Sequence, residues 1–180
     1  MATTSKARTA KRGGNSPRAA GRRRTLSLCN DQHLRPVDLR LLRRIVLSLL
    51  REVWAHGSFD LAVNIVSAPE MTRLNETFLR HKGSTDVITF DYVERQGDAL
   101  LYGEVFVCID KAVSQACHYG TTWQSELVRY VVHGVLHLLG HDDQDSRSRR
   151  RMKQAEDALV GALADKFPLR SLGARASKRQ

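Results

Sequence analysis

The feature that most constrains this 180-residue chain is the run 133–137, His-Gly-Val-Leu-His, together with Gly140 and Asp143 just after it. Two histidines four residues apart on an apolar helix lie one turn above the other, so both imidazoles can reach one ion. Gly140 is the residue type that most readily ends a helix in the left-handed conformation, which lets the chain fold back over that ion. The spacing therefore predicts a metal site with His133, His137 and Asp143 as ligands.

The same spacing matches the metzincin peptidase pattern H-E-x-x-H-x-x-G-x-x-H except at two positions. Gly134 stands where the peptidases have the glutamate that serves as general base, which argues against ordinary proteolysis. Asp143 stands where they have a third histidine, and a carboxylate is also a good zinc ligand. His141 and Asp142 are rival third ligands, because spacing alone does not say which side chain of the turn points inward.

Two imidazoles and one carboxylate would leave a zinc ion with an open coordination position, as in catalytic sites. A zinc ion of this kind lowers the pKa of bound water toward about 7 and polarises phosphoryl oxygens, which suits hydrolysis of phosphodiesters. A fourth protein ligand, from His141 or Asp142, would instead close the site and make it structural. We expect one Zn²⁺ per chain.

Around this site the sequence resembles the YbeY endoribonucleases, which are metal-dependent rRNA maturation factors with the signature HGxLHLxGxDH. The run 133–143 follows that signature except at its last histidine, which is Asp143 here. The segment 74–90 resembles the family block LNxxYR...TDVLSFP, and the segment 103–107 resembles its GDI strand. The resemblance covers roughly residues 25 to 160.

The resemblance implies a single-strand-specific zinc endoribonuclease that acts in 16S rRNA 3′-end maturation and 70S ribosome quality control. It implies rRNA in the small ribosomal subunit as the partner, and no DNA is expected. Two rival functions remain in view. One is another zinc metallohydrolase, such as a protease, and the other is a non-catalytic ribosome assembly factor whose metal only holds the turn together.

Phosphoryl transfer also needs a cation that stabilises charge on the phosphate oxygens. Arg80 is the candidate catalytic residue, because it lies in the segment that resembles LNxxYR. The position of the family arginine, counted from Asn75, is occupied by Leu79, and Arg80 follows it. The alternative interpretation of Arg80 is an exposed charge on a loop.

The net charge of +10 is concentrated at the two ends of the chain. Residues 1–24 carry +8 and residues 165–180 carry +4, so the part between them carries −2. We expect a disordered basic arm over 1–24, an endoribonuclease domain over 25–164 and a basic tail over 165–180. The arm could follow RNA phosphates or serve as a solubilising extension, and its composition also resembles an organelle transit peptide.

Hydrophobic periodicity predicts short strands alternating with amphipathic helices. The strands are expected over 25–29, 59–66, 87–93 and 104–109, and the helices over 36–54, 69–80, 111–118, from 121 or 122 through the metal histidines, and 146–164. This order predicts an α+β fold, with a small mixed β-sheet packed with helices and a zincin-like metal helix. The chain lacks a bilayer-length apolar run, a secretory signal and a C-x-x-C pair, so a cytoplasmic protein without membrane contact is expected.

Overall fold

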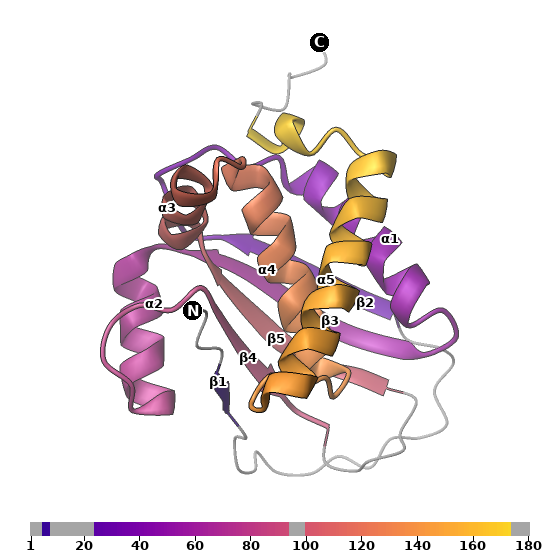
Figure 1. Ribbon diagram of the computed structural model, residues 1–180, viewed down its shortest axis with the longest axis horizontal. Helices are drawn as coiled ribbons and strands as arrows, with labels where there is room; N and C mark the ends of the chain where they lie inside the picture. Colours follow the sequence, from indigo (N-terminus) through magenta and orange to yellow (C-terminus); the bar gives the residue numbers. More distant parts are fainter. Residues whose placement is uncertain (1–4, 8–23, 94–99, 174–180) are drawn as a thin grey trace.

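The computed structural model describes residues 5–7, 24–93 and 100–173. It has the predicted α+β architecture, a mixed β-sheet packed with helices (Figure 1). The elements, in chain order, are β1 (Ser5–Ala7), β2 (Arg24–Asn30), α1 (Leu39–Val53), β3 (Ser58–Val66), α2 (Ala68–Leu74), the π-helix η1 (Asn75–Leu79), β4 (Val87–Asp91), β5 (Leu100–Cys108), α3 (Ile109–Tyr119), α4 (Trp123–Leu138), α5 (Ser146–Lys166) and the 3₁₀-helix η2 (Leu169–Gly173).

The sheet has five strands in the order β1-β4-β5-β3-β2. Strands β2, β3 and β5 run parallel, and β4 pairs antiparallel with β5. Strand β5 begins at Leu100, before the expected start at 104. Leu101 and Gly103 are buried where they pair with Phe59 and Leu61 of β3, and this packing extends the strand.

Part of the N-terminal arm belongs to the sheet. Ser5–Ala7 pairs in parallel with residues 88–90 of β4, and Arg24 is the first residue of β2. The prediction of disorder for 1–24 is wrong at these positions, because the outer edge of β4 offers unpaired backbone groups that even a short segment can satisfy. The rest of the arm, 1–4 and 8–23, lies outside the described residues.

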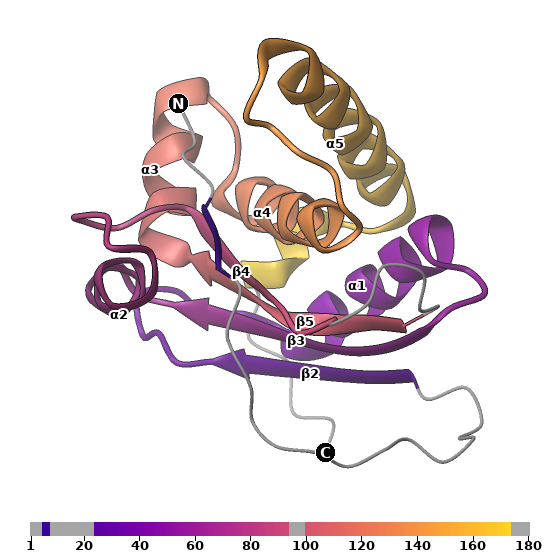
Figure 2. The ribbon, with the colours of Figure 1, turned by 90° about the horizontal axis from the view of Figure 1, so that it is seen from below.

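Helices α1, α4 and α5 cover one face of the sheet, as Figure 2 shows, and enclose the larger core. Helix α2 and η1 pack on the opposite face around a smaller cluster. The alternation of side chains along a strand separates the two cores, since Val87 belongs to the larger one and its neighbour Ile88 to the smaller one. None of the described helices is long and apolar enough to cross a bilayer.

Several helix boundaries differ from the prediction, and the helix expected over 69–80 is divided into α2 and the π-helix η1. Helix α1 begins at Leu39 and not at Pro36, because Asp38 caps it by accepting hydrogen bonds from the backbone of Arg40 and Leu41. At the other end of the chain, α5 runs to Lys166 and η2 follows it. The folded part therefore extends past the expected boundary at 164, since the leucines of η2 are buried in the larger core although the segment is basic overall.

Candidate metal centre

Helix α4 places the two histidines, and its ends follow the sequence closely. Thr122 caps its start by accepting a hydrogen bond from the backbone N–H of Ser125 at 3.2 Å. Gly140, with φ 88°, turns the chain after the helix, and the N–H of His141 bonds back to the carbonyl of Leu136. Because of this turn, the loop that carries Asp143 returns alongside the helix.

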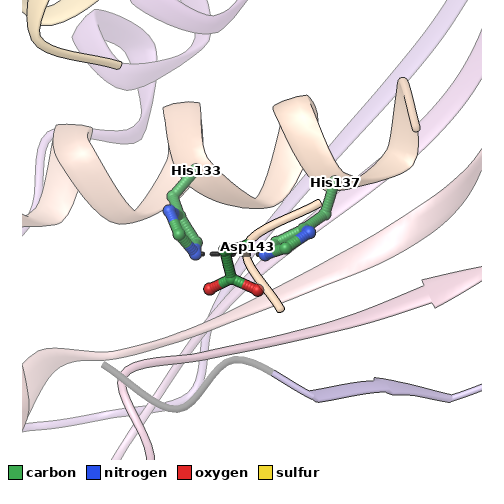
Figure 3. A group of neighbouring side chains, drawn as sticks. All are labelled: His133, His137 and Asp143. Carbon is green, nitrogen blue, oxygen red and sulfur yellow. Dashed lines mark hydrogen bonds between the residues drawn. The ribbon is translucent and has the colours of Figure 1, made fainter. Parts of the chain in front are cut away.

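The three predicted ligands lie together. His133 and His137 extend from one face of α4, and the Asp143 carboxylate lies opposite them (Figure 3). The Nε2 atoms of the two histidines are 3.2 Å apart, and one atom from each of the three side chains lies within 4.8 Å of the others. This group could hold a metal ion.

The other nitrogen of each imidazole is held by an acceptor. Nδ1 of His133 lies 2.8 Å from Oε2 of Glu156, and Nδ1 of His137 lies 3.0 Å from the backbone carbonyl of His141. An imidazole that donates from Nδ1 in its neutral form has only a lone pair at Nε2. Two such lone pairs facing each other repel unless a proton or a metal ion lies between them, so this pair of nitrogens is arranged to bind a cation.

The donor set also fits zinc by distance. Zinc bound tetrahedrally to two imidazole nitrogens holds them about 3.3 Å apart, given Zn–N bonds of about 2.05 Å. The observed separation of 3.2 Å between the Nε2 atoms of His133 and His137 is close to this value. Metal-bound histidines commonly donate their other N–H to a carboxylate or a backbone carbonyl, and both kinds of acceptor are present here.

Glu156 is itself held in place by Arg129. Nη1 of Arg129 lies 2.6 Å from Oε1 of Glu156 and 2.5 Å from Oδ1 of Asp157. Burial on its own would raise the pKa of Glu156, but the hydrogen bonds from His133 and Arg129 outweigh it and hold the pKa below its ordinary value. Glu156 is therefore an anion at neutral pH and a strong acceptor for the His133 N–H.

The rival third ligands have other roles in the structure. Oδ1 of Asp142 accepts hydrogen bonds from the backbone N–H groups of Asp143 and Gln144, at 2.7 and 3.1 Å. The imidazole of His141 is exposed, and its backbone carbonyl is the group that faces His137. Within the described part of the chain, Asp143 is the acidic residue that joins the two histidines.

Arg80 does not lie at this site. It follows η1 with a left-handed backbone (φ 57°), and its side chain is exposed. It is also not among the described residues that line the cavity beside His133 and Asp143. Leu79, which occupies the family arginine's position, packs against the smaller core.

A cavity of about 470 Å³ adjoins the candidate metal centre, between α3, α4 and α5. His133 and Asp143 form part of its wall, and Arg149 and Lys153 of α5 form another part. The sequence analysis missed Glu156 and the α5 cations. A signal for Glu156 was present, because its carboxylate interrupts a buried apolar stripe of α5 formed by Met152, Val160 and Leu163.

Comparisons with known proteins show the family to which the chain belongs. The family described as Endoribonuclease YbeY matches residues 28–164. Similar curated proteins named Endoribonuclease YbeY include one from Salinibacter ruber, 32% identical over 148 residues that cover 77% of this chain and 91% of the relative. One from Roseiflexus castenholzii is 34% identical over 139 residues, with 73% and 87% covered.

Other matches extend over different lengths. A Myxococcus xanthus protein with the same name is 37% identical over 105 residues, but the matched part spans only 36% of that protein. A solved solution structure of a Thermotoga maritima protein has a TM-score of 0.60 and 23% identity, and the match covers 87% of this chain and 100% of that one. The Thermotoga protein therefore shares the fold described above.

Proposed function

Because the chain belongs to the YbeY endoribonuclease family, we propose that it is a metal-dependent endoribonuclease that hydrolyses phosphodiester bonds in single-stranded RNA. The observation that carries the proposal is the convergence of the Nε2 atoms of His133 and His137 beside Asp143, with both Nδ1 atoms held by acceptors. Such a site is organised for a cation before substrate arrives.

The residues of the site have separate roles in this proposal. A zinc ion held by His133, His137 and Asp143 would supply a Lewis acid for a phosphoryl oxygen and an activated water near neutral pH. Glu156 fixes the tautomer and the orientation of His133, and Arg129 fixes Glu156. These two are positioning residues in the proposal, because Glu156 contacts the ligand His133 and Arg129 contacts Glu156.

The surroundings of Gly134 support a nuclease over a peptidase. A Cβ atom at this position would collide with Cγ1 of Val105 and lie 3.3 Å from Cγ2 of Thr89, so position 134 faces the sheet and leaves no room for a side chain. Position 134 therefore cannot carry the general base that metzincin peptidases have at this point of the motif.

For the biological role, we propose 16S rRNA 3′-end maturation and quality control of 70S ribosomes, with the small ribosomal subunit as partner in the cytoplasm. The family membership and the net charge of +10 support an RNA partner. We further propose Zn²⁺ as the metal, because two imidazoles and one carboxylate form a typical donor set for catalytic zinc.

The test uses the full chain with three substrates: single-stranded RNA, double-stranded RNA and casein, each with and without a chelator. We expect chelator-sensitive cleavage of single-stranded RNA alone. Cleavage of casein would support a metalloprotease. If wild type cleaves no RNA and His133→Ala lowers the melting temperature sharply, the metal has a structural role and the protein is an assembly factor.

A further inference from the structure

The cavity between α3, α4 and α5 is lined by polar groups that have no role in the proposed metal centre. We propose that this cavity is a subsite that binds one nucleotide of the RNA strand, next to the phosphate that lies at the metal. The inference rests on the proposed function and adds to it a group of residues that hold the substrate. Its volume of about 470 Å³ lies in the usual range for small-molecule sites.

Tyr130 provides the first observation. Its side chain lines the cavity and is only 5% exposed, and its hydroxyl has no hydrogen-bond partner among the described residues. A buried hydroxyl without a partner costs free energy, so folded proteins rarely keep one without a reason. A ligand that accepts a hydrogen bond inside the cavity would satisfy this group.

Asp86 places an acceptor on the same wall. Its carboxylate is 9% exposed, and the hydrogen bonds from Thr85 and the backbone of Val87 both go to Oδ1. Oδ2 of Asp86 can therefore accept a hydrogen bond from a ligand, and the hydroxyl of Tyr130 can donate a hydrogen bond to the same ligand. A nucleobase edge carries donors and acceptors side by side, whereas inorganic phosphate at neutral pH is mainly an acceptor.

Tyr119, 64% exposed at the rim, offers an aromatic ring on which a base could stack.

Arg149 and Lys153 line the cavity from α5, one helical turn apart. Nε of Arg149 donates to the backbone carbonyl of Asp143 at 3.1 Å, which places its guanidinium beside the metal loop. Arg129, the third cation of the wall, is already paired with three carboxylates, those of Glu126, Glu156 and Asp157. Lys153 has one looser ion pair, with Asp157 at 3.8 Å, and its side chain is 71% exposed. Arg149 and Lys153 are therefore the cations best placed to meet the phosphate of a bound nucleotide.

The start of α5 is rich in positive charge. The Asp145 carboxylate caps the helix, and the arginines 147, 149, 150 and 151 crowd the first two turns, which contain no further acidic residue. An anionic strand would offset this repulsion.

The same segment offers a matched control. At about 100° per residue, Arg147 and Arg151 each lie about 160° around the helix from Arg149, which places them on the far side from the cavity.

The first test measures binding of labelled single-stranded RNA by fluorescence anisotropy, with chelator present so that no turnover occurs. Arg149→Gln/Lys153→Gln should weaken binding at least about tenfold and reduce the slope of log K against log salt by about 1.4, since each phosphate contact contributes about 0.7. Arg147→Gln/Arg151→Gln removes the same charge and should change the affinity less than threefold. Equal losses in the two double variants would show a diffuse charge effect and overturn the proposal.

Arg149 also contacts the metal loop, so Lys153→Gln alone provides a check that leaves the loop intact. This variant should reduce the slope of log K against log salt by about 0.7 and should leave the zinc affinity unchanged. An acidic peptide such as polyglutamate is the competing class of ligand. If it displaces the RNA as well as an unlabelled RNA of equal charge does, the surface binds an acidic protein segment and the proposal is wrong.

The second test uses Tyr130→Phe, which removes only the hydroxyl. In the free protein this variant should be as stable as wild type or more so, because no partner loses a bond, yet its affinity for nucleoside monophosphates should fall severalfold. Titrations followed by NMR, with inorganic phosphate as the reference ligand, measure both affinities. Lower stability with unchanged nucleotide binding would assign the hydroxyl a structural role and overturn the subsite.

The outcomes separate the subsite from the proposed function. RNA binding that depends on Arg149, Lys153 and Tyr130, without cleavage by wild type, would retain the subsite and reject the nuclease. Cleavage that is insensitive to all three substitutions would retain the nuclease and reject the subsite.

Discussion

Glu156 of α5 lies 2.8 Å from Nδ1 of His133 on α4, so the second helix fixes the orientation of a ligand on the first. The contact joins residues 23 positions apart, and the two side chains are only 12% and 11% exposed. Because of this contact, the packing of α5 against α4 determines how the His133 imidazole is oriented at the metal centre.

Replacing this carboxylate should therefore weaken metal binding without removing any ligand. Glu156→Gln is expected to lower zinc affinity about 10- to 100-fold, because the amide is a weaker acceptor and no longer selects one tautomer of His133. Isothermal titration calorimetry measures the change. Asp157→Asn is the control, since Asp157 contacts Arg129 but not the histidine, and zinc affinity equal in the two variants would contradict the role of Glu156.

The third ligand can be tested by comparing neighbouring substitutions in the metal loop. Asp143→Ala should lose most zinc affinity, whereas His141→Ala should retain it, because His141 uses its backbone carbonyl and not its imidazole. Metal content after dialysis gives the answer. Loss of zinc in His141→Ala alone would identify that imidazole as the ligand.

Metal removal should also reduce stability. A ligand that binds only the folded state at about 100 times its Kd adds about 2.7 kcal/mol to the free energy of unfolding. We therefore expect chelator to lower the melting temperature of wild type and to leave that of Asp143→Ala nearly unchanged. A wild-type melting temperature that does not respond to chelator would mean that the three side chains bind no metal.

Gly134 should be intolerant of even a methyl group. Gly134→Ala places a Cβ against Val105 and Thr89, and overpacking of this kind costs about 1–3 kcal/mol. Gly161→Ala on α5 is the matched control, since a Cβ there meets no atom within 4 Å and alanine is the better helix former by about 1 kcal/mol. Denaturant unfolding of both variants should give changes of opposite sign. A stabilising Gly134→Ala would show that α4 can move away from the sheet.

The alkaline limit of stability should depend on Tyr92. Burial, together with the nearby Glu104, raises the pKa of Tyr92 from 10.0 to about 12. Since the folded state holds this proton more tightly, the stabilisation is complete below pH 10 and is lost as the pH rises through 12. Tyr92→Phe should therefore lose less stability than wild type between pH 9 and pH 11.5 in denaturant titrations. An identical loss in both proteins would contradict the shift.

The sequence predicted those features of the site that depend on local spacing. The pair His133 and His137, a helix start at 121 or 122 and the turn at Gly140 all lie within one stretch of chain, so helix geometry alone places them. The orientation of the loop after Gly140 is a different matter. Only packing decides that Asp143 turns toward the histidines while Asp142 bonds to the loop backbone.

The rest required tertiary information. Glu156 reaches His133 because α5 folds back over α4, and no spacing rule connects positions 23 residues apart. Arg149 reaches the backbone of Asp143 because the loop between α4 and α5 turns back on itself. The addition of Ser5–Ala7 to the sheet depends on an open strand edge, which a disordered composition does not reveal. The burial of the η2 leucines was not predicted either, because the basic residues around them in the sequence indicate an exposed tail.

The backbone N–H of Asp38, at the start of α1, donates to the carbonyl of Leu172 at 2.9 Å, and Leu172 is fully buried. During synthesis, helix α1 leaves the ribosome long before residues 169–173 do. The contact between Leu172 and the start of α1 can therefore form only after residues 169–173 have emerged, so this part of the core closes late in synthesis.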